Sequence, residues 1–250
     1  MKRGREVEKQ SEIKSAIEEL SMLTKLKPST SGDDDHGATA HIPTRPFLYI
    51  CNLVIQVLDK IGPTMAVLRQ DIDQNIQRLE RQCDSDPSLY SNLVEIVKEE
   101  VNQGNARKGP SCSKALVWLT SFAVVEFSIA SSESPDERGI QNLLPRSLEF
   151  TVALLQRLAK DCDQDMEQAV EESYNITLKQ WHGWISSAAF KVALKLVPDN
   201  KTFIDLLMTK DETEESFKAD IQTLISLLVN YLEEIRPILR SYGLEKLKST

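Results

Sequence analysis

The sequence contains little of what builds β-sheets, metal sites or catalytic loops. Among 250 residues there are nine glycines, ten prolines and only 6% aromatic residues, which disfavours a β-sandwich or a barrel. The four cysteines and three histidines form no CxxC pair and no zinc-ligand spacing. We therefore expect no metal and no cofactor, and we interpret the cysteines as reduced thiols.

The chain also lacks a long apolar run and an excess of basic charge. No stretch approaches the roughly 20 apolar residues that span a bilayer, and no apolar region follows the charged start, as a signal peptide would require. The formal net charge of −8 argues against nucleic acid as a partner, because no basic stripe offsets phosphate repulsion. We expect a soluble, cytoplasmic monomer that touches membrane surfaces only locally and transiently.

Helical patterns, in contrast, are abundant. Hydrophobic residues make up 41% of the chain, which is enough for a substantial core. Apolar positions recur with the period of an α-helix, so we expect an all-α protein. The predicted helices cover residues 1–27, 46–60, 64–83, 89–102, 111 onward, 146–162, 166–196, 201–209 and 214–241.

The first 44 residues differ in composition from the rest of the chain. Pro28 ends the first predicted helix, and residues 29–44 are small, acidic and glycine-containing, which is typical of a linker. We therefore expect an amino-terminal helix and acidic linker over 1–44, and a folded domain over 45–250. Within this domain, plausible helix N-caps are Ser85 or Asp86 in one place and Ser111 or Ser113 in another.

One predicted helix, 64–83, carries a polar row on its apolar side. At 100° per residue, Asp71, Asn75 and Arg78 lie within about 60° of one another. Apolar residues flank and continue the same arc, whereas charged and amide residues fill the opposite arc. Unpaired polar groups would cost several kcal/mol there. Either they form a buried polar network, or they bind a ligand that is half polar and half apolar.

A second informative segment, Trp181-His182-Gly183-Trp184, lies about a hundred residues further on. Taken alone, His182 would more often be a core histidine with satisfied hydrogen bonds. Trp184 and the earlier Trp118, taken alone, would most often fill a core. The segment becomes informative when it is combined with the Asp71 row and the Trp118 segment, because the three motifs occur in a specific order and spacing.

Together these motifs resemble the signature of the glycolipid transfer protein family over about residues 45–242. The resemblance implies a two-layer all-α sandwich of about eight helices, with a hydrophobic pocket that encloses the two hydrocarbon chains of a sphingolipid. It also implies an intermembrane carrier that binds and transfers glycosylceramides. The motifs are Asp71-x-x-x-Asn75-x-x-Arg78, Ala115-Leu-Val-Trp118-Leu, and Trp181-His182-Gly183-Trp184 followed by Ala193-Leu-Lys-Leu-Val-Pro198.

The resemblance assigns roles to five side chains that would bind the lipid. Asp71 would accept hydrogen bonds from a head-group hydroxyl and the ceramide amide N–H, and His182 would donate to the amide carbonyl. Asn75 and Arg78 would bind sugar hydroxyls. The indole of Trp118 would stack on the C–H face of the sugar ring.

Two further positions bear on the membrane and on the head group. Trp184, at an exposed helix start, would contact the membrane because indole favours the water–bilayer boundary. Family members often have a lysine where this chain has Arg78. The arginine replaces the compact ammonium charge of lysine by a planar guanidinium. Relatives that carry ceramide 1-phosphate place cations where this chain has Asn75 and Trp118. We therefore expect a neutral glycosylceramide, with ceramide 1-phosphate transfer as the alternative.

Residues 121–145 differ more strongly from the family pattern. In the family, the helix that carries the position of Trp118 continues through this point without interruption. Joining Thr120 to Arg146 restores a continuous helical pattern, whereas the segment itself contains glycine and proline residues that break helices. We interpret the segment as a splice feature or a gene-model error, and a real loop is the alternative. If it inactivates transfer, the chain would be a non-enzymatic lipid-sensing or interaction module.

Enzymatic function is not supported by the sequence. Asp71, Asp73 and His182 would have to serve as acid and base, yet the two aspartates lie about 200° apart around a helix. No nucleophile motif, phosphate loop or metal cluster accompanies them. We predict that the protein is not an enzyme.

Overall fold

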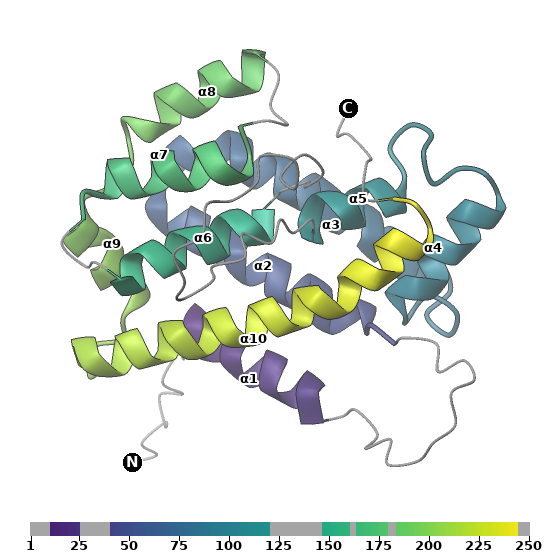
Figure 1. Cartoon of the computed structure of the whole chain (residues 1–250), viewed down its shortest axis with the longest axis horizontal. Helices are drawn as coiled ribbons and strands as arrows, with labels where there is room; N and C mark the ends of the chain where they lie inside the picture. Colours follow the sequence, from purple (N-terminus) through teal and green to yellow (C-terminus); the bar gives the residue numbers. More distant parts are fainter. Residues whose placement is uncertain (1–10, 26–40, 121–146, 161–163, 180–183, 245–250) are drawn as a thin grey trace, which may run out of the picture.

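The computed structural model describes residues 11–25, 41–120, 147–160, 164–179 and 184–244 (Figure 1). These ranges contain ten α-helices and no strand longer than the isolated bridge between Pro43 and Asn92. The all-α prediction is therefore confirmed, with ten described helices where the family resemblance implied about eight. The helices are α1 (Glu12–Lys25), α2 (Thr44–Ile61), α3 (Ala66–Ser85), α4 (Leu93–Asn102), α5 (Cys112–Thr120), α6 (Ser147–Lys160), α7 (Met166–Thr177), α8 (Trp184–Leu194), α9 (Asn200–Leu207) and α10 (Glu214–Ser241), and the 3-10 helix η1 covers Pro63–Met65.

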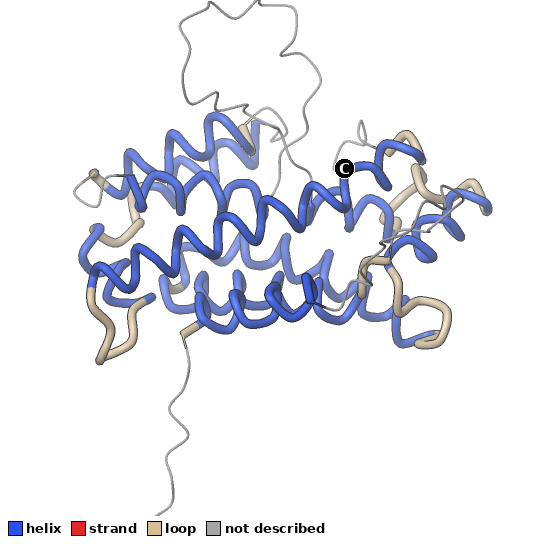
Figure 2. Tube along the Cα trace, turned by 60° about the horizontal axis from the view of Figure 1, so that its bottom comes forward, coloured by secondary structure: helices blue, strands red, loops and turns tan. Residues whose placement is uncertain are grey.

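Six of the helices form a closed ring. Around it, α2 packs on α3, α3 on α5, α5 on α6, α6 on α10, α10 on α1, and α1 on α2. Figure 1 shows α2 and α3 behind α6 and α10, and Figure 2 shows the long helices running side by side in stacked rows. This is the expected two-layer arrangement, and α7, α8 and α9 extend it at one end.

The predicted single helix over 166–196 is wrong, because α7 ends at Thr177 and α8 begins at Trp184. The rings of Tyr174 and Phe190 stack with centroids 3.5 Å apart and planes 8° apart. The Tyr174 hydroxyl also donates to Ser187 Oγ at 3.3 Å. The two helices therefore pack against each other. Apolar residues recur at helical spacing in both, so periodicity alone cannot show where one helix ends and the next begins.

The caps were predicted with mixed success. Ser111 caps α5 as expected, because its hydroxyl accepts the N–H of Lys114 at 3.1 Å. The predicted cap at Ser85 or Asp86 is wrong, and Asp86 instead makes a turn in which its side chain accepts the N–H of Ser88 at 3.1 Å. Helix α4 starts later than predicted because Asn92 provides its cap.

Helix α1 belongs to the hydrophobic core. Its side chains Ile13, Ala16 and Leu20 are buried together with residues of α2 and α10. The structure thus adds α1 to the folded unit that the sequence predicted to begin near Arg45. Residues 26–40, most of the predicted linker, and residues 121–145, the predicted insertion, lie outside the described residues. No helix in the described part of the chain is long and apolar enough to cross a membrane.

Candidate functional site

An apolar cavity of about 540 Å³ lies among eight of the helices. Its volume is in the range of small-molecule sites, which are mostly apolar with a few placed polar groups. Among the described lining residues only Glu12, Asp71 and Thr151 are polar. The apolar wall comes from amphipathic helices that direct their hydrophobic stripes inward, and examples are Ile13 of α1, Leu53 and Val57 of α2, Leu154 of α6, Phe190 of α8, Phe203 of α9 and Leu228 of α10.

Asp71 lies on this wall, between the lining residues Leu68 and Ile72 of α3. Its carboxylate accepts no hydrogen bond from any residue that the structure describes, and it forms no ion pair with one. Partial burial raises the pKa of Asp71 above its ordinary value, because desolvation disfavours the charged form. The cavity wall therefore offers an acceptor with unused hydrogen-bonding capacity.

Asn75 and Arg78 continue the row from Asp71. Asn75 Nδ2 donates to the backbone oxygen of Asp71 at 2.7 Å, and Arg78 Nη1 donates to Asn75 Oδ1 at 2.9 Å. The neighbouring Ile72 and Ile76 are each only 1% exposed, which confirms the predicted apolar surroundings. The row is thus partly a polar network, since Asn75 orients Arg78, but the Asp71 carboxylate is left out of it.

Trp118 lies on α5, which packs against α3. The thiol of Cys112 donates to the backbone oxygen of Arg78 at 3.6 Å, and this contact joins the start of α5 to the end of the polar row. Trp118 itself is 8% exposed and belongs to the hydrophobic core. It is not among the residues that line the cavity, so its stacking on a sugar stays a prediction.

The histidine motif is only partly described. His182, with Trp181 and Gly183, lies outside the described residues, so its contact with an amide carbonyl stays a prediction. Trp184 is the first residue of α8 and is 82% exposed, as expected for a surface anchor.

Two more large apolar residues are exposed, one on α8 and one just after it, and neither was predicted from the sequence to lie on the surface. Val192 is 65% exposed and Leu196 is 53% exposed, and both also line the cavity. Val192 lies within about a quarter turn of Trp184 around α8. The cavity therefore reaches the surface beside the helix that carries Trp184. The sequence does contain apolar residues at helical spacing here, and this spacing could have indicated an apolar surface beside Trp184.

The described residues that line the cavity include no histidine, cysteine, serine or lysine. They contain no group of three or more His, Cys, Asp or Glu side chains placed to hold a metal ion. Cys51, Cys83 and Cys112 are buried thiols, and burial raises the pKa of Cys112 to about 12. A buried protonated thiol is a poor nucleophile. The arrangement is suited to binding an amphipathic molecule.

A helical sandwich around an apolar cavity, with a wall carboxylate that has no partner among the described residues, is the architecture of a protein that binds an amphipathic ligand. The family model described as glycolipid transfer protein matches residues 42–130 and 122–209. The chain therefore belongs to the glycolipid transfer protein family, as the sequence motifs indicated.

Among its relatives, the chain is 52% identical over 242 residues to glycolipid transfer protein 3 of Arabidopsis thaliana, covering 96% of this chain and 93% of the relative. It is 48% identical over 252 residues to glycolipid transfer protein 2 of the same plant, with both chains fully covered. The second alignment thus includes the amino-terminal segment.

Solved structures agree on the fold. A structure of FAPP2, described as selecting simple glycosphingolipids with the GLTP-fold, superimposes with a TM-score of 0.67 at 27% identity, covering 89% of this chain and 98% of that one. Mouse ceramide-1-phosphate transfer protein superimposes with a TM-score of 0.72 at 16% identity, covering 95% and 100%. The latter similarity shows the fold alone.

Proposed function

We propose that this protein binds a glycosphingolipid, preferably a glycosylceramide, and carries it between membranes. The observation that carries the proposal is the Asp71 carboxylate, which has no partner among the described residues and lies on the wall of a mostly apolar cavity. A ceramide provides an amide N–H and a hydroxyl at the point where its chains meet the head group. These donors would satisfy Asp71 while the chains fill the cavity. Relatives named glycolipid transfer proteins support this assignment.

The cavity and the Asp71 carboxylate would contribute differently to binding, because the lipid comes from a bilayer and not from water. Burying a methylene away from water is worth about 0.8 kcal/mol, but a lipid in a bilayer has already buried its chains. Moving the chains from the bilayer into the cavity is therefore close to neutral. The polar contacts at Asp71 would then decide which lipid leaves the membrane.

The remaining row residues would read the head group. We assign sugar hydroxyls to Asn75 and Arg78, the sugar ring face to Trp118, and the amide carbonyl to His182. Arg78 already donates to Asn75, so the amide limits how freely the guanidinium can turn toward an anion. This contact favours a neutral sugar over the alternative, ceramide 1-phosphate.

Membrane contact would occur through the exposed apolar residues of α8 and the turn after it. Trp184, Val192 and Leu196 are exposed. Lys191 is exposed on the same segment, whereas the exposed Lys195 is already ion-paired with Glu167. Indole and aliphatic groups insert shallowly, and a lysine such as Lys191 faces anionic lipids. Because Val192 and Leu196 also line the cavity, a lipid would pass directly from the membrane into it.

We further propose that the protein is a cytoplasmic monomer and that it is not an enzyme.

A transfer assay between vesicles tests the proposed function. Donor vesicles contain labelled glucosylceramide or labelled phosphatidylcholine with the same acyl chain. Acceptor vesicles contain no labelled lipid. We expect the protein to accelerate transfer of glucosylceramide and to leave phosphatidylcholine in the donors. Equal transfer of both lipids, or of neither, would contradict the proposal.

A further inference from the structure

The described wall of the cavity carries two charged side chains, Asp71 on α3 and Glu12 on α1. Glu12 is only 7% exposed and lies beside Ile13 and Ala16, which line the same cavity. A carboxylate in such apolar surroundings needs hydrogen-bond donors. The proposed function gives Asp71 its donors, whereas Glu12 is not explained by it.

Only one oxygen of Glu12 has a partner among the residues that the structure describes. Glu12 Oε2 forms an ion pair with Lys60 Nζ, which also donates to the backbone oxygen of Leu206 at 3.0 Å. Lys60 thereby fixes the carboxylate between α1, α2 and the end of α9. Oε1 accepts no hydrogen bond from the described part of the chain. Since an ionised carboxylate has about four acceptor positions, an oriented acceptor remains at the cavity wall.

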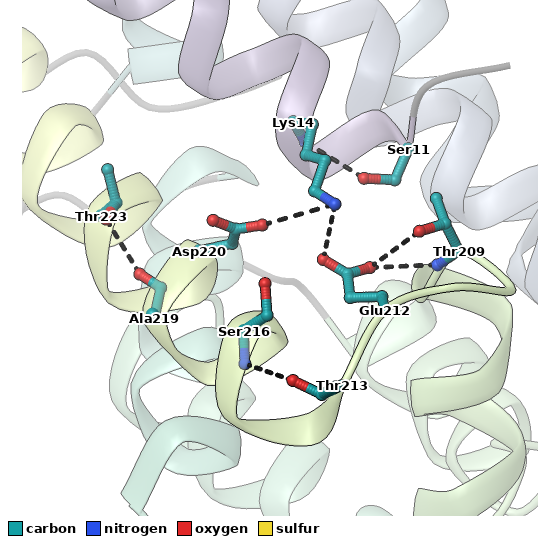
Figure 3. A network of polar contacts seen from close by, with 9 residues as sticks. All are labelled: Ser11, Lys14, Thr209, Glu212, Thr213, Ser216, Ala219, Asp220 and Thr223. Atoms are coloured by element: carbon teal, nitrogen blue, oxygen red, sulfur yellow. Dashed lines mark hydrogen bonds and ion pairs between the residues drawn. The ribbon is translucent and has the colours of Figure 1, made fainter. Parts of the chain in front are cut away.

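Helix α1 has a separate anchor that does not touch the cavity. Lys14 Nζ lies 3.0 Å from Glu212 Oε1 and 3.9 Å from Asp220 Oδ2 (Figure 3). Glu212 is held in turn, because it accepts the N–H of Thr209 at 3.0 Å. None of these four residues lines the cavity. Both ion pairs hold α1, but of their carboxylates only Glu12 belongs to a residue that lines the cavity.

We propose that Glu12 is a second recognition point, which binds a hydroxyl group carried on the hydrocarbon chain of the lipid. The inference rests on the proposed function, because it requires a lipid in the cavity. An alcohol is uncharged, so it enters an apolar cavity far more readily than an ion. It can donate one hydrogen bond to Oε1, whereas a plain chain leaves that oxygen unsatisfied. Sites that hydrogen-bond a hydroxyl discriminate against analogues that lack it.

The test uses glucosylceramides that differ only in the acyl chain. One carries a plain octadecanoyl chain, and the others carry a single hydroxyl near the amide, at mid-chain or near the chain end. We expect the full-length protein to bind one hydroxylated isomer about ten to a hundred times more tightly than the plain lipid, as one hydrogen bond to a carboxylate allows. Equal binding of all four lipids would overturn the inference and leave the proposed function standing.

Two variants assign the preference to Glu12. Glu12→Leu should abolish it, whereas Lys14→Met, which breaks the anchor outside the cavity, should retain it. If both variants lose the preference equally, a loosened α1 explains the effect and the inference fails. If Glu12→Leu does not fold, Glu12→Gln should weaken the preference, because a neutral amide oxygen is the poorer acceptor, and an unchanged preference refutes the assignment. Failure to bind any of the glucosylceramides would instead refute the proposed function.

Discussion

Replacing Asp71 by valine should weaken lipid binding without weakening the fold. The carboxylate would accept two hydrogen bonds from the lipid, and a bond to a charged group contributes about 1.5 to 3 kcal/mol. Because Asp71 is only partly buried, the lower value applies to each bond. A loss of about 3 kcal/mol corresponds to roughly hundredfold weaker binding of glucosylceramide.

The lipid-free protein should respond in the opposite direction. Desolvation raises the pKa of Asp71 in the folded state, so the folded protein holds this proton more tightly than the unfolded chain. The charged carboxylate therefore costs stability at neutral pH, and this cost disappears as the pH falls through the raised pKa. Asp71→Val should unfold at the same temperature as the parent or higher at neutral pH, and its advantage should shrink on acidification.

Both effects are measurable on one pair of proteins. Binding is followed with a fluorescent glucosylceramide, and unfolding is followed by circular dichroism at several pH values. Asp73→Val is the matched control, because Asp73 lies on the same helix and does not line the cavity. Its carboxylate accepts a hydrogen bond from the Gln77 side-chain amide. Unchanged affinity for Asp71→Val would refute the assigned role. A melting temperature several degrees lower would show that Asp71 is structural.

Three further predictions concern the membrane, the head group and the insertion. Trp184→Ala should lower vesicle binding and slow transfer with little effect on helical content, whereas Leu89→Ala, an exposed apolar residue outside α8, should change neither; equal transfer rates for the two variants would remove Trp184 from the membrane contact. Asn75→Lys should shift selectivity toward ceramide 1-phosphate in a competition assay, because it adds a charge-assisted donor without burying a charge in the core as a change at Trp118 would; an unchanged ratio would refute the head-group assignment. Deleting residues 121–145 should raise the melting temperature and the transfer rate, because it restores a helical pattern and removes the cost of closing a loop; a deletion that unfolds the protein would show that the segment supplies core.

The polar row could be predicted because it depends on local geometry. Once a helix forms over 64–83, the angles between Asp71, Asn75 and Arg78 follow from 100° per residue, and α3 shows the expected apolar neighbours. The long helix α10 was also predicted with the bounds that the structure shows, since one apolar stripe runs along it without interruption.

The features that could not be predicted depend on contacts between distant segments. Helices α7 and α8 pack on each other through the stack of Tyr174 on Phe190, and the apolar periodicity of the sequence cannot reveal such a contact. Likewise, the amphipathic pattern of residues 1–27 indicated a buried face, but it could not show that the partners are α2 and α10. The place of Glu12 on the cavity wall follows only from that packing.

Native mass spectrometry of the protein after incubation with mixed vesicles tests the central claim most directly. The vesicles contain equal amounts of glucosylceramide, ceramide 1-phosphate and phosphatidylcholine with matched acyl chains. We predict a protein carrying one glucosylceramide as the dominant complex. A protein that remains lipid-free, or that carries mainly ceramide 1-phosphate or phosphatidylcholine, would contradict the assignment as a glycosylceramide carrier.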